Sequence, residues 1–337
     1  MSGAVETLFM PLASGDIDPP GEGERFAFLN AAALRELPET VAKTALACEQ
    51  GFRPEFLALQ RAGYDVLPEL DASASAFAGA LVLAGKHKGE NHAMVARACR
   101  LVRAGGAVCV AGDKTIGIQP LRKWVGDRAD IDGSLAKHHA TVFWFRAPEV
   151  GIFTDAVEPY GLVDGRFETA PGMFSHGKPD AGSVLLAEHF DARIKGVVAD
   201  FGSGWGFLSA LVLEKGRPES LALFEAHYPS LKAAERNLSS FAGDVPLKAN
   251  WCDLTSEPVA RQFDWIVMNP PFHAGRASEP DIGKAFIAAA SKALVPGGRL
   301  LMVANRKLPY EQALAQGFRR VEEKAVRDGF KVIEAMR

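Results

Sequence analysis

The sequence feature that most constrains the fold is residues 197–208, where an apolar strand runs into three alternating glycines and then into a helix. Gly202, Gly204 and Gly206 let the backbone approach a ligand closely, and the start of the helix offers free N–H groups. This arrangement is typical of a nucleotide site at the edge of an α/β sheet. The dinucleotide pattern G-x-G-x-x-G requires a glycine where this chain has Phe207, which disfavours an oxidoreductase.

Acidic residues around the glycine loop indicate which ligand it holds. Asp200 precedes the glycines in the spacing D-x-G-x-G-x-G, which resembles the S-adenosylmethionine loop of class I methyltransferases. Glu225 ends the next strand, where we expect it to accept hydrogen bonds from both ribose hydroxyls, a role that dinucleotide enzymes share. Asp253 follows a further strand, and we favour a contact with an adenine amine over a helix cap or a surface acid. Ser203, inside the loop, joins this expected cofactor site.

A second stretch, Asn269-Pro270-Pro271-Phe272, ends an apolar strand. Each proline fixes its own φ angle and lacks an N–H group, so the segment presents oxygen acceptors in an extended shape. The Asn269 side-chain oxygen and the Pro270 carbonyl can each accept one N–H of an exocyclic amine, while Phe272 stacks on the attached ring. We therefore expect these four residues to form the catalytic corner. A strand-ending turn without a ligand is the alternative.

Composition excludes several classes of protein. At 337 residues, with 48% hydrophobic and 23% charged residues, the chain is long enough for two domains of ordinary size. It has no apolar run of membrane-spanning length and no basic start of a signal peptide, so we expect a cytoplasmic protein without a membrane contact. The net charge of −3 gives no global sign of nucleic-acid binding, which leaves any such binding to local patches.

The cysteines and histidines do not indicate a metal or a redox site. The four cysteines are far apart and include no C-x-x-C pair, so we expect reduced core thiols rather than disulfides, zinc ligands or a nucleophile. The histidines do not have the spacing of metal ligands, and we expect no metal.

The order of the expected elements repeats, which indicates an internal duplication. Over residues 263–304 a strand, a loop, a helix ending at Gly297-Gly298 and another strand follow one another, and the same order surrounds Gly105-Gly106 in the first half. Opposite Asn269-Pro270-Pro271-Phe272 the first half has Ala84-Gly85-Lys86-His87, which lacks the acceptors and the ring. It also lacks a glycine-rich loop. We interpret the first half as a catalytically silent copy, kept for folding or for contact with the substrate.

Loop signals divide the chain into a first domain at residues 1–146, a linker with a hairpin at 147–171 and a catalytic domain at 172–337. Alternating strands and helices predict the α/β class. Residues 1–25, which mix apolar residues with Gly and Pro, are expected to form an irregular lead-in. The Ala- and Leu-rich residues 31–45 are expected to form a helix.

Short basic clusters in the first domain are candidate contacts to RNA phosphates. They lie beside strand ends or in loops: Lys86-His87-Lys88, Arg122-Lys123 and Lys137-His138-His139. Solvated surface is the simpler interpretation of each cluster.

The motifs of the second half together resemble those of the bacterial rRNA guanine-N2 methyltransferases of the RsmC and RlmG type. The matching segments run through the whole domain: Phe174-Ser175, residues 200–206, Asn269-Pro270-Pro271-Phe272-His273, Val303-Ala304-Asn305, Leu308-Pro309-Tyr310 and Gly329-Phe330-Lys331-Val332. The chain departs from many relatives at Phe201 and Ser203, and its first half is divergent.

The resemblance implies two tandem class I methyltransferase-like, Rossmann-like domains, with a degenerate first copy and a mixed seven-stranded sheet in the second. It implies S-adenosyl-L-methionine as the cofactor, and on this basis we add Phe174 and Asn269 to the cofactor-binding residues. It implies ribosomal RNA as the partner, with 16S rRNA of the small ribosomal subunit the nearer likeness. The acceptor would be the 2-amino group of a guanine.

The expected reaction places an extruded guanine on Phe272, with its 2-amino group held by Asn269 and Pro270. The amine lone pair is delocalised into the ring, so two acceptors that favour a pyramidal nitrogen would raise its nucleophilicity. Alignment rather than a strong base would supply most of the rate.

Other planar amines stay open as substrates, because the same corner serves a 23S rRNA guanine, the N6 of a DNA adenine or a protein glutamine. A DNA enzyme would usually add a separate target-recognition domain. A noncatalytic RNA-binding or assembly factor is the alternative from another class, and the intact glycine loop disfavours it.

Overall fold

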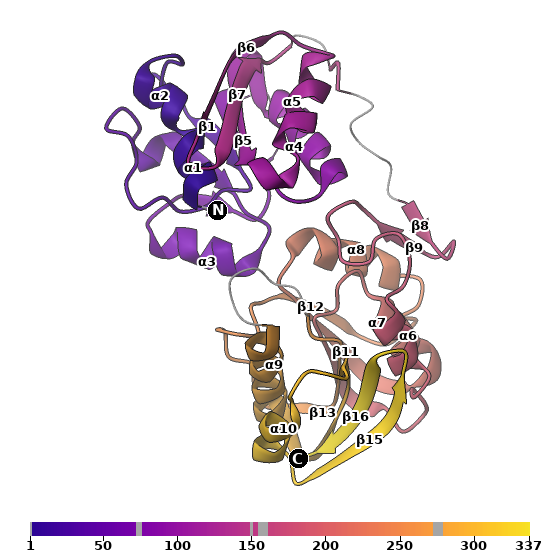
Figure 1. Ribbon diagram of the computed structural model, residues 1–337. Coiled ribbons are helices and arrows are strands. Elements are labelled where there is room, and N and C mark those ends of the chain that lie inside the picture. The colour runs from indigo at the N-terminus through magenta and orange to yellow at the C-terminus, as the bar shows by residue number, and fades with distance from the viewer. Residues whose placement is uncertain (1, 72–75, 149–150, 154–160, 272–278) are drawn as a thin grey trace. The chain divides into compact units, whose positions relative to one another are not determined.

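The computed structural model describes residues 2–71, 76–148, 151–153, 161–271 and 279–337. Contacts divide the chain into two compact units (Figure 1). The first is formed by Met1–Pro159 with Ala170–Gly172, and the second by Tyr160–Thr169 with Met173–Arg337.

The second unit contains a mixed seven-stranded sheet with the order β12-β11-β10-β13-β14-β16-β15. Its strands are β10 (Lys195–Phe201), β11 (Arg217–Glu225), β12 (Leu247–Trp251), β13 (Phe263–Met268), β14 (Leu294–Asn305), β15 (Arg320–Arg327) and β16 (Phe330–Met336). Its helices are α6 (Ala181–Ala187), α7 (Phe207–Lys215), α8 (Tyr228–Leu238), α9 (Glu279–Ala293) and α10 (Glu311–Gly317). Neighbouring strands are parallel from β12 to β14, and β16 is antiparallel to both of its neighbours.

Side chains of β10 alternate between the two faces of this sheet. Phe201 belongs to the core that packs against α9 and α10, and it is fully buried. Its neighbour Asp200 points to the opposite face, where it meets Ser209 of α7. The alternation therefore delivers an acidic side chain to the base of the glycine loop.

The first unit repeats this topology with the strand order β3-β2-β1-β4-β5-β7-β6. Its strands are β1 (Phe26–Leu29), β2 (Leu46–Glu49), β3 (Val66–Leu67), β4 (Phe77–Leu83), β5 (Val102–Asp113), β6 (Ile131–Lys137) and β7 (Ala140–Arg146). Its helices are α1 (Ser2–Leu8), α2 (Met10–Ser14), α3 (Arg53–Arg61), α4 (Lys88–Leu101) and α5 (Ile118–Gly126), with short 3-10 turns η1 (Lys43–Ala45) and η2 (Lys114–Ile116). The predicted α/β duplication is confirmed.

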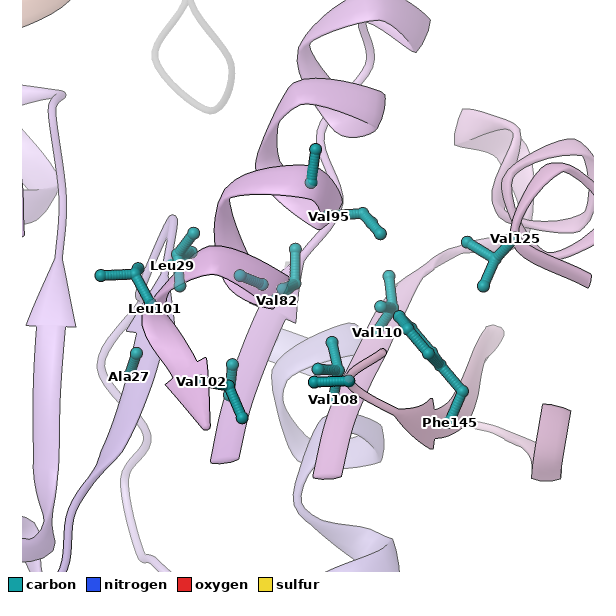
Figure 2. Packing of buried hydrophobic residues seen from close by; sticks show 14 of the residues in the cluster. Ala27, Leu29, Val82, Val95, Leu101, Val102, Val108, Val110, Val125 and Phe145 are labelled. Atoms are coloured by element: carbon teal, nitrogen blue, oxygen red, sulfur yellow. The ribbon is translucent and has the colours of Figure 1, made fainter. Parts of the chain in front are cut away.

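The core of the first unit lies between its central strands and helices α4 and α5 (Figure 2). This cluster includes Val82 of β4, Val110 of β5, Phe145 of β7 and Val95 of α4, and all four are fully buried. Burying one such side chain stabilises a fold by roughly 1.5–3 kcal/mol. The first unit therefore has a hydrophobic core of its own.

The hairpin predicted at Val163-Asp164-Gly165-Arg166 is formed by β8 (Gly161–Val163) and β9 (Phe167–Thr169). It groups with the second unit, where Phe167 stacks on Phe241 with ring centroids 5.6 Å apart. The Glu168 N–H donates to the Asn237 side chain of α8 at 2.7 Å. The hairpin thus covers one end of α8.

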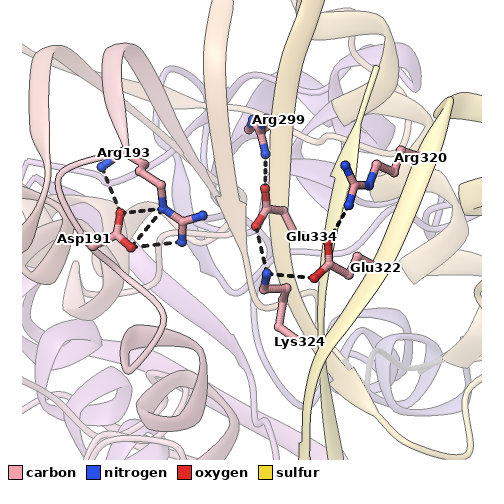
Figure 3. Close-up of polar contacts among 7 residues, drawn as sticks. All are labelled: Asp191, Arg193, Arg299, Arg320, Glu322, Lys324 and Glu334. Atoms are coloured by element: carbon pink, nitrogen blue, oxygen red, sulfur yellow. Dashed lines mark hydrogen bonds and ion pairs between the residues drawn. The ribbon is translucent and has the colours of Figure 1, made fainter.

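The outer strands of the second unit carry a network of charges (Figure 3). Glu322 and Glu334 are directly opposite each other on β15 and β16, a pairing of like charges that alone would be destabilising. Lys324 contacts both, with N–O distances of 2.9 Å to Glu322 and 3.8 Å to Glu334, and Arg299 of β14 pairs with Glu334. The cations offset the repulsion and connect three strands.

The strand register corrects the alignment of the two copies by one residue. In β13, Phe263 pairs with Leu294 and Met268 with Met302; in β4, Phe77 pairs with Val102 and Val82 with Val110. The two paired residues are five positions apart in each strand, so Phe263 corresponds to Phe77 and Met268 to Val82. The residue that follows, Leu83, is therefore the counterpart of Asn269, and not Ala84 as the sequence comparison proposed.

Two other expectations about the first half were wrong. Residues 2–14, expected to be irregular, form α1 and α2, and α1 contacts β5 and β7. Residues 31–42, expected to be helical, contain turns and bends instead, followed by η1. Pro38 interrupts a helix there, whereas the apolar residues of α1 and α2 find a core to cover.

Gly283 of α9 packs so closely against Tyr310 that an alanine there should destabilise the second unit. An added methyl group would overlap the Tyr310 hydroxyl and lie 2.8 Å from ring carbon Cε1. Exchange of Gly for Ala inside a helix normally stabilises by about 1 kcal/mol. We expect Gly283→Ala instead to lower the free energy of unfolding, measured with urea, by about 1–3 kcal/mol.

The matched control is Gly126→Ala in α5, where the nearest atom to the added methyl, Ile131 Cγ1, is 3.6 Å away. This control should not destabilise. A Gly283→Ala protein as stable as the parent would contradict the packing at Tyr310.

Candidate active site

The glycine loop after β10 has a backbone that side chains would disturb. Gly202, Gly204 and Gly206 have φ angles of 78°, 53° and 95°, all in the left-handed region that favours glycine. A Cβ atom at Gly206 would also meet Ala234 of α8 at 3.3 Å. Gly206 is the N-cap of α7 and precedes its free N–H groups. Side chains at these three positions would therefore strain the backbone of the loop.

Asp200 is fully buried at the base of this loop. Its Oδ2 accepts from the Ser209 hydroxyl at 2.7 Å, and its Oδ1 has no hydrogen-bond partner among the described residues. Burial raises the pKa of Asp200 to about 7, against the lowering effect of the Ser209 hydrogen bond. A carboxyl group in this condition favours a cationic ligand.

Glu225 ends β11 beside the same loop. Its Oε2 accepts from the Gly204 N–H and its Oε1 from the His227 N–H, both at 2.8 Å. Burial raises the pKa of Glu225, while these backbone hydrogen bonds act in the opposite direction. Each oxygen has a second lone pair, so the carboxylate can still accept from a ligand.

Asp253 is occupied by its own loop. Its Oδ1 accepts from the N–H and the hydroxyl of Thr255, at 2.9 and 2.6 Å, and its Oδ2 from the Ser256 hydroxyl at 2.6 Å. A side chain that accepts from the N–H two residues later forms an Asx turn. The predicted contact between Asp253 and an adenine amine stays a prediction.

Asn269 follows the last residue of β13. Its Nδ2 donates to Asp180 Oδ2 and to Ser183 Oγ, each at 2.8 Å. Its Oδ1 is buried and has no hydrogen-bond partner among the described residues. Next to it, Pro270 is buried and Pro271 is exposed. Phe272, with the ring stacking expected of it, lies outside the described residues.

A pocket in the second unit brings five of the predicted site residues together: Phe174, Gly202, Ser203, Gly204 and Asn269. The predicted residues that do not line it are Asp200, Gly206, Glu225, Asp253, Pro270 and Pro271. The pocket is also lined by residues that the sequence analysis did not select: Ser175, Asp180, Ser183, Trp205, Phe207 and Leu208.

Phe174 lies at this pocket with its side chain 59% exposed. The Trp205 indole N–H donates to the Phe174 carbonyl at 2.8 Å, which ties the segment before α6 to the glycine loop. Ser175 has a φ of 53°, a conformation uncommon for a residue other than glycine. The exposed ring of Phe174 is thus held beside the glycine loop.

The cysteine thiols of the described residues are free, and three of them resist ionisation. All four cysteines are free, and burial raises the pKa of Cys48, Cys99 and Cys109 to about 12, so these thiols are unreactive. Within the described ranges, no group of His, Cys, Asp and Glu side chains is placed to hold a metal ion. None of the described helices is long and apolar enough to cross a membrane.

The first unit keeps the strand pairing that underlies the site. Leu29 pairs with Val82 and with Glu49, as Phe201 pairs with Met268 and with Phe224. The residues that follow Glu49 and Phe224 are Gln50 and Glu225, so these two are counterparts. By the same register Phe28 is the counterpart of Asp200.

The chemistry of the first unit differs at these positions. Gln50 Oε1 accepts from the Phe52 N–H at 2.8 Å, as Glu225 does from His227. The other end of Gln50 is a donor, and Nε2 contacts the Ala31 carbonyl at 2.7 Å. In the first unit, Gln50 thus stands in place of Glu225, and Phe28 in place of Asp200. Leu83 stands in place of Asn269. This supports the interpretation of a silent copy.

Comparisons with known proteins agree with this geometry. The sequence model of the family described as Methyltransferase small domain matches residues 164–334. Ribosomal RNA small subunit methyltransferase C of Salmonella arizonae is 30% identical over 237 residues, which are 69% of this chain and 68% of that protein. This chain belongs to the ribosomal RNA small subunit methyltransferase C family. The family member from Escherichia coli (strain K12 / DH10B) is 30% identical over 254 residues, covering 74% of this chain and 73% of its own.

A solved structure of the family shares the fold over both units. T. thermophilus 16S rRNA N2 G1207 methyltransferase (RsmC), in complex with AdoMet and guanosine, matches with a TM-score of 0.78 at 24% sequence identity. The match covers 99% of this chain and 91% of that chain. The predicted family and the predicted pair of methyltransferase-like domains are confirmed.

The raised pKa of Asp200 should make the stability of the ligand-free protein depend on pH. The folded state holds its proton up to about pH 7, whereas an unfolded Asp loses it near pH 4, so stability should fall as pH rises between about 4 and 7. Asp200→Asn cannot titrate and should flatten this part of the curve. Urea unfolding of both proteins at about pH 5 and about pH 7 measures the difference. An equal change in unfolding free energy between the two pH values in both proteins would contradict the raised pKa of Asp200.

Proposed function

We propose that this protein transfers a methyl group from S-adenosyl-L-methionine to the 2-amino group of a guanine in 16S ribosomal RNA. The observation that carries the proposal is the Asn269 side-chain oxygen, which is buried without a partner among the described residues, on a residue that lines the pocket beside the glycine loop. A buried acceptor of this kind is costly unless a ligand donates to it. An exocyclic amine is such a donor.

The residues around the glycine loop fit S-adenosyl-L-methionine better than a dinucleotide. Asp200 is a buried acid, and after burial itself the charge of Glu225 contributes to its raised pKa. A cationic cofactor relieves this repulsion, whereas the phosphates of a dinucleotide would add to it. The Ser203 hydroxyl is also buried without a partner among the described residues. We assign Asp200, Glu225 and the loop from Gly202 to Gly206 to the cofactor.

The bound cofactor supplies an activated methyl group on a positively charged sulfur. The chain supplies alignment: Asn269 Oδ1 and the Pro270 carbonyl each accept one N–H of the guanine 2-amino group. Two acceptors at one amine favour a pyramidal nitrogen, whose lone pair would form the new bond to the methyl carbon as the carbon–sulfur bond breaks. The sulfur would keep that bonding pair as a neutral thioether, and the methylated amine would release one proton through Asn269 or to water. Phe272 and the exposed ring of Phe174 would stack on planar parts of the ligands.

The choice of guanine in 16S rRNA rests on the relatives. The corner itself suits any planar amine, and so leaves a 23S rRNA guanine, a DNA adenine and a protein glutamine chemically open. The small-subunit rRNA methyltransferases among its relatives span most of this chain, including part of the first unit. We accordingly propose ribosomal RNA as the partner, a cytoplasmic site of action, and a first unit that assists folding or RNA contact.

The proposal predicts that deletion of the gene removes one N2-methylguanosine from 16S rRNA and leaves 23S rRNA unchanged. The wild-type gene should restore this mark, and a gene with Asn269→Ala should not, because loss of one transition-state acceptor lowers kcat by about a hundredfold or more. Mass spectrometry of both rRNAs measures the marks. An unchanged map would contradict the rRNA assignment.

The purified Asn269→Ala protein provides the control. It should bind S-adenosyl-L-methionine with an affinity within about twofold of wild type, since we expect Asp200, Glu225 and the glycine loop to supply most of the cofactor contacts and Asn269 only a minor one. Loss of cofactor binding together with lost folding would indicate a structural role for Asn269 instead.

A further inference from the structure

The orientation of the Asn269 amide is set by the start of helix α6. Both N–H groups of Asn269 Nδ2 are taken up, one by Asp180 Oδ2 and one by Ser183 Oγ. Asp180 is the N-cap of α6, and the same Oδ2 accepts from the Ser183 N–H at 2.9 Å. One carboxylate oxygen therefore caps the helix and holds the amide.

We propose that Asp180 is a positioning residue that makes Asn269 present only its oxygen to the substrate. The inference rests on the proposed function, because it specifies how that reaction selects its atom. The two ends of an amide have nearly the same shape, so packing alone does not distinguish them. Turning the amide over would place Asn269 Oδ1 at 2.8 Å from the Asp180 carboxylate, with oxygen facing oxygen and the hydrogen bond to Asp180 lost. The Ser183 hydroxyl can donate as well as accept, so it would tolerate either orientation and Asp180 decides between them.

This orientation decides which group of a guanine the corner binds. Guanine carries an amine donor at position 2 and a carbonyl acceptor at position 6. An oxygen in the pocket accepts from the amine and repels the carbonyl, whereas an amide nitrogen would do the reverse. Asp180 thereby favours the 2-amino group at the site of transfer.

Helix capping alone does not require an acid at this position. Ser and Asn cap helices about as well as Asp does, and Thr somewhat less well. A serine side chain is one bond shorter than aspartate, so we expect it to keep the cap and lose the contact with Asn269. Gly182 leaves room for the longer side chain, since a Cβ there would lie 3.1 Å from Asp180 Oδ2 and 3.0 Å from Phe330. The carboxylate therefore has a task beyond the helix cap.

Asp180→Ser separates the two tasks, because serine retains the cap and loses the contact with Asn269. We expect kcat on 16S rRNA to fall about tenfold to a hundredfold, the cost of a misaligned acceptor. The dissociation constant for S-adenosyl-L-methionine and the melting temperature should stay close to wild type. Asp113→Ser is the matched control: Asp113 caps η2 in the first unit by accepting from the Thr115 N–H, and its loss should leave kcat unchanged.

A signal independent of activity completes the test. In wild-type protein labelled with 15N-asparagine, the side-chain amide of Asn269, identified by its absence from Asn269→Ala, should exchange its protons slowly. Asp180→Ser should speed this exchange by about tenfold or more, because one of the two acceptors is lost.

The outcomes distinguish this inference from the proposed function. A wild-type protein that transfers no methyl group to 16S rRNA would overturn the function, while the exchange signal would still decide the orientation. An active wild type with an equally active Asp180→Ser and unchanged exchange would overturn the role of Asp180 alone. Weaker cofactor binding at unchanged kcat would also overturn it, by showing that Asp180 contacts the methyl donor.

Discussion

The parallel pairing of β10 with β13 is the constraint on which the rest of the site depends. Phe201 and Met268 are partners in this pair, so the glycine loop and Asn269 leave the sheet at the same level. The strand order reverses here, with β11 on one side and β14 on the other, and such a switch point is where open α/β sheets bind ligands. The strand pairing alone therefore brings the glycine loop and Asn269 together.

The first unit shows what this pairing does when its polar residues are replaced. β1 and β4 pair in the corresponding register, but Phe28 and Leu83 stand where Asp200 and Asn269 stand in the second unit. Both are almost fully buried in apolar surroundings. Gln50 is satisfied by the surrounding backbone, because it donates to the Ala31 carbonyl and accepts from the Phe52 N–H. Replacing acids by apolar residues removes desolvation costs of several kcal/mol, so the copy can serve as a stable scaffold.

Short-range patterns revealed the features of the site that lie within one segment of chain. The conformation of the glycine loop follows from its three glycines, which adopt positive φ angles, and that of the corner at Asn269 follows from its prolines. Asp180 lies 89 residues before Asn269, and its only local signal is that of a helix cap three residues before Ser183. No short-range pattern connects these residues, so the sequence did not predict their contact.

Other differences arose where tertiary contacts override local composition. Phe9 is buried and meets Phe28 edge-on at 5.6 Å, which gives the Gly- and Pro-containing lead-in a core to cover. Residues 31–42 have the composition of a helix but the path of a loop.

The central claim is that the Asn269 oxygen receives the 2-amino group of guanine, and nucleoside binding tests it most directly. Inosine is guanosine without this amine, so calorimetry with S-adenosylhomocysteine present compares the two ligands at one atom. The account predicts that wild type binds guanosine about tenfold more tightly than inosine, and that Asn269→Ala loses this preference. Equal affinities in wild type, or an undiminished preference in the variant, would contradict it.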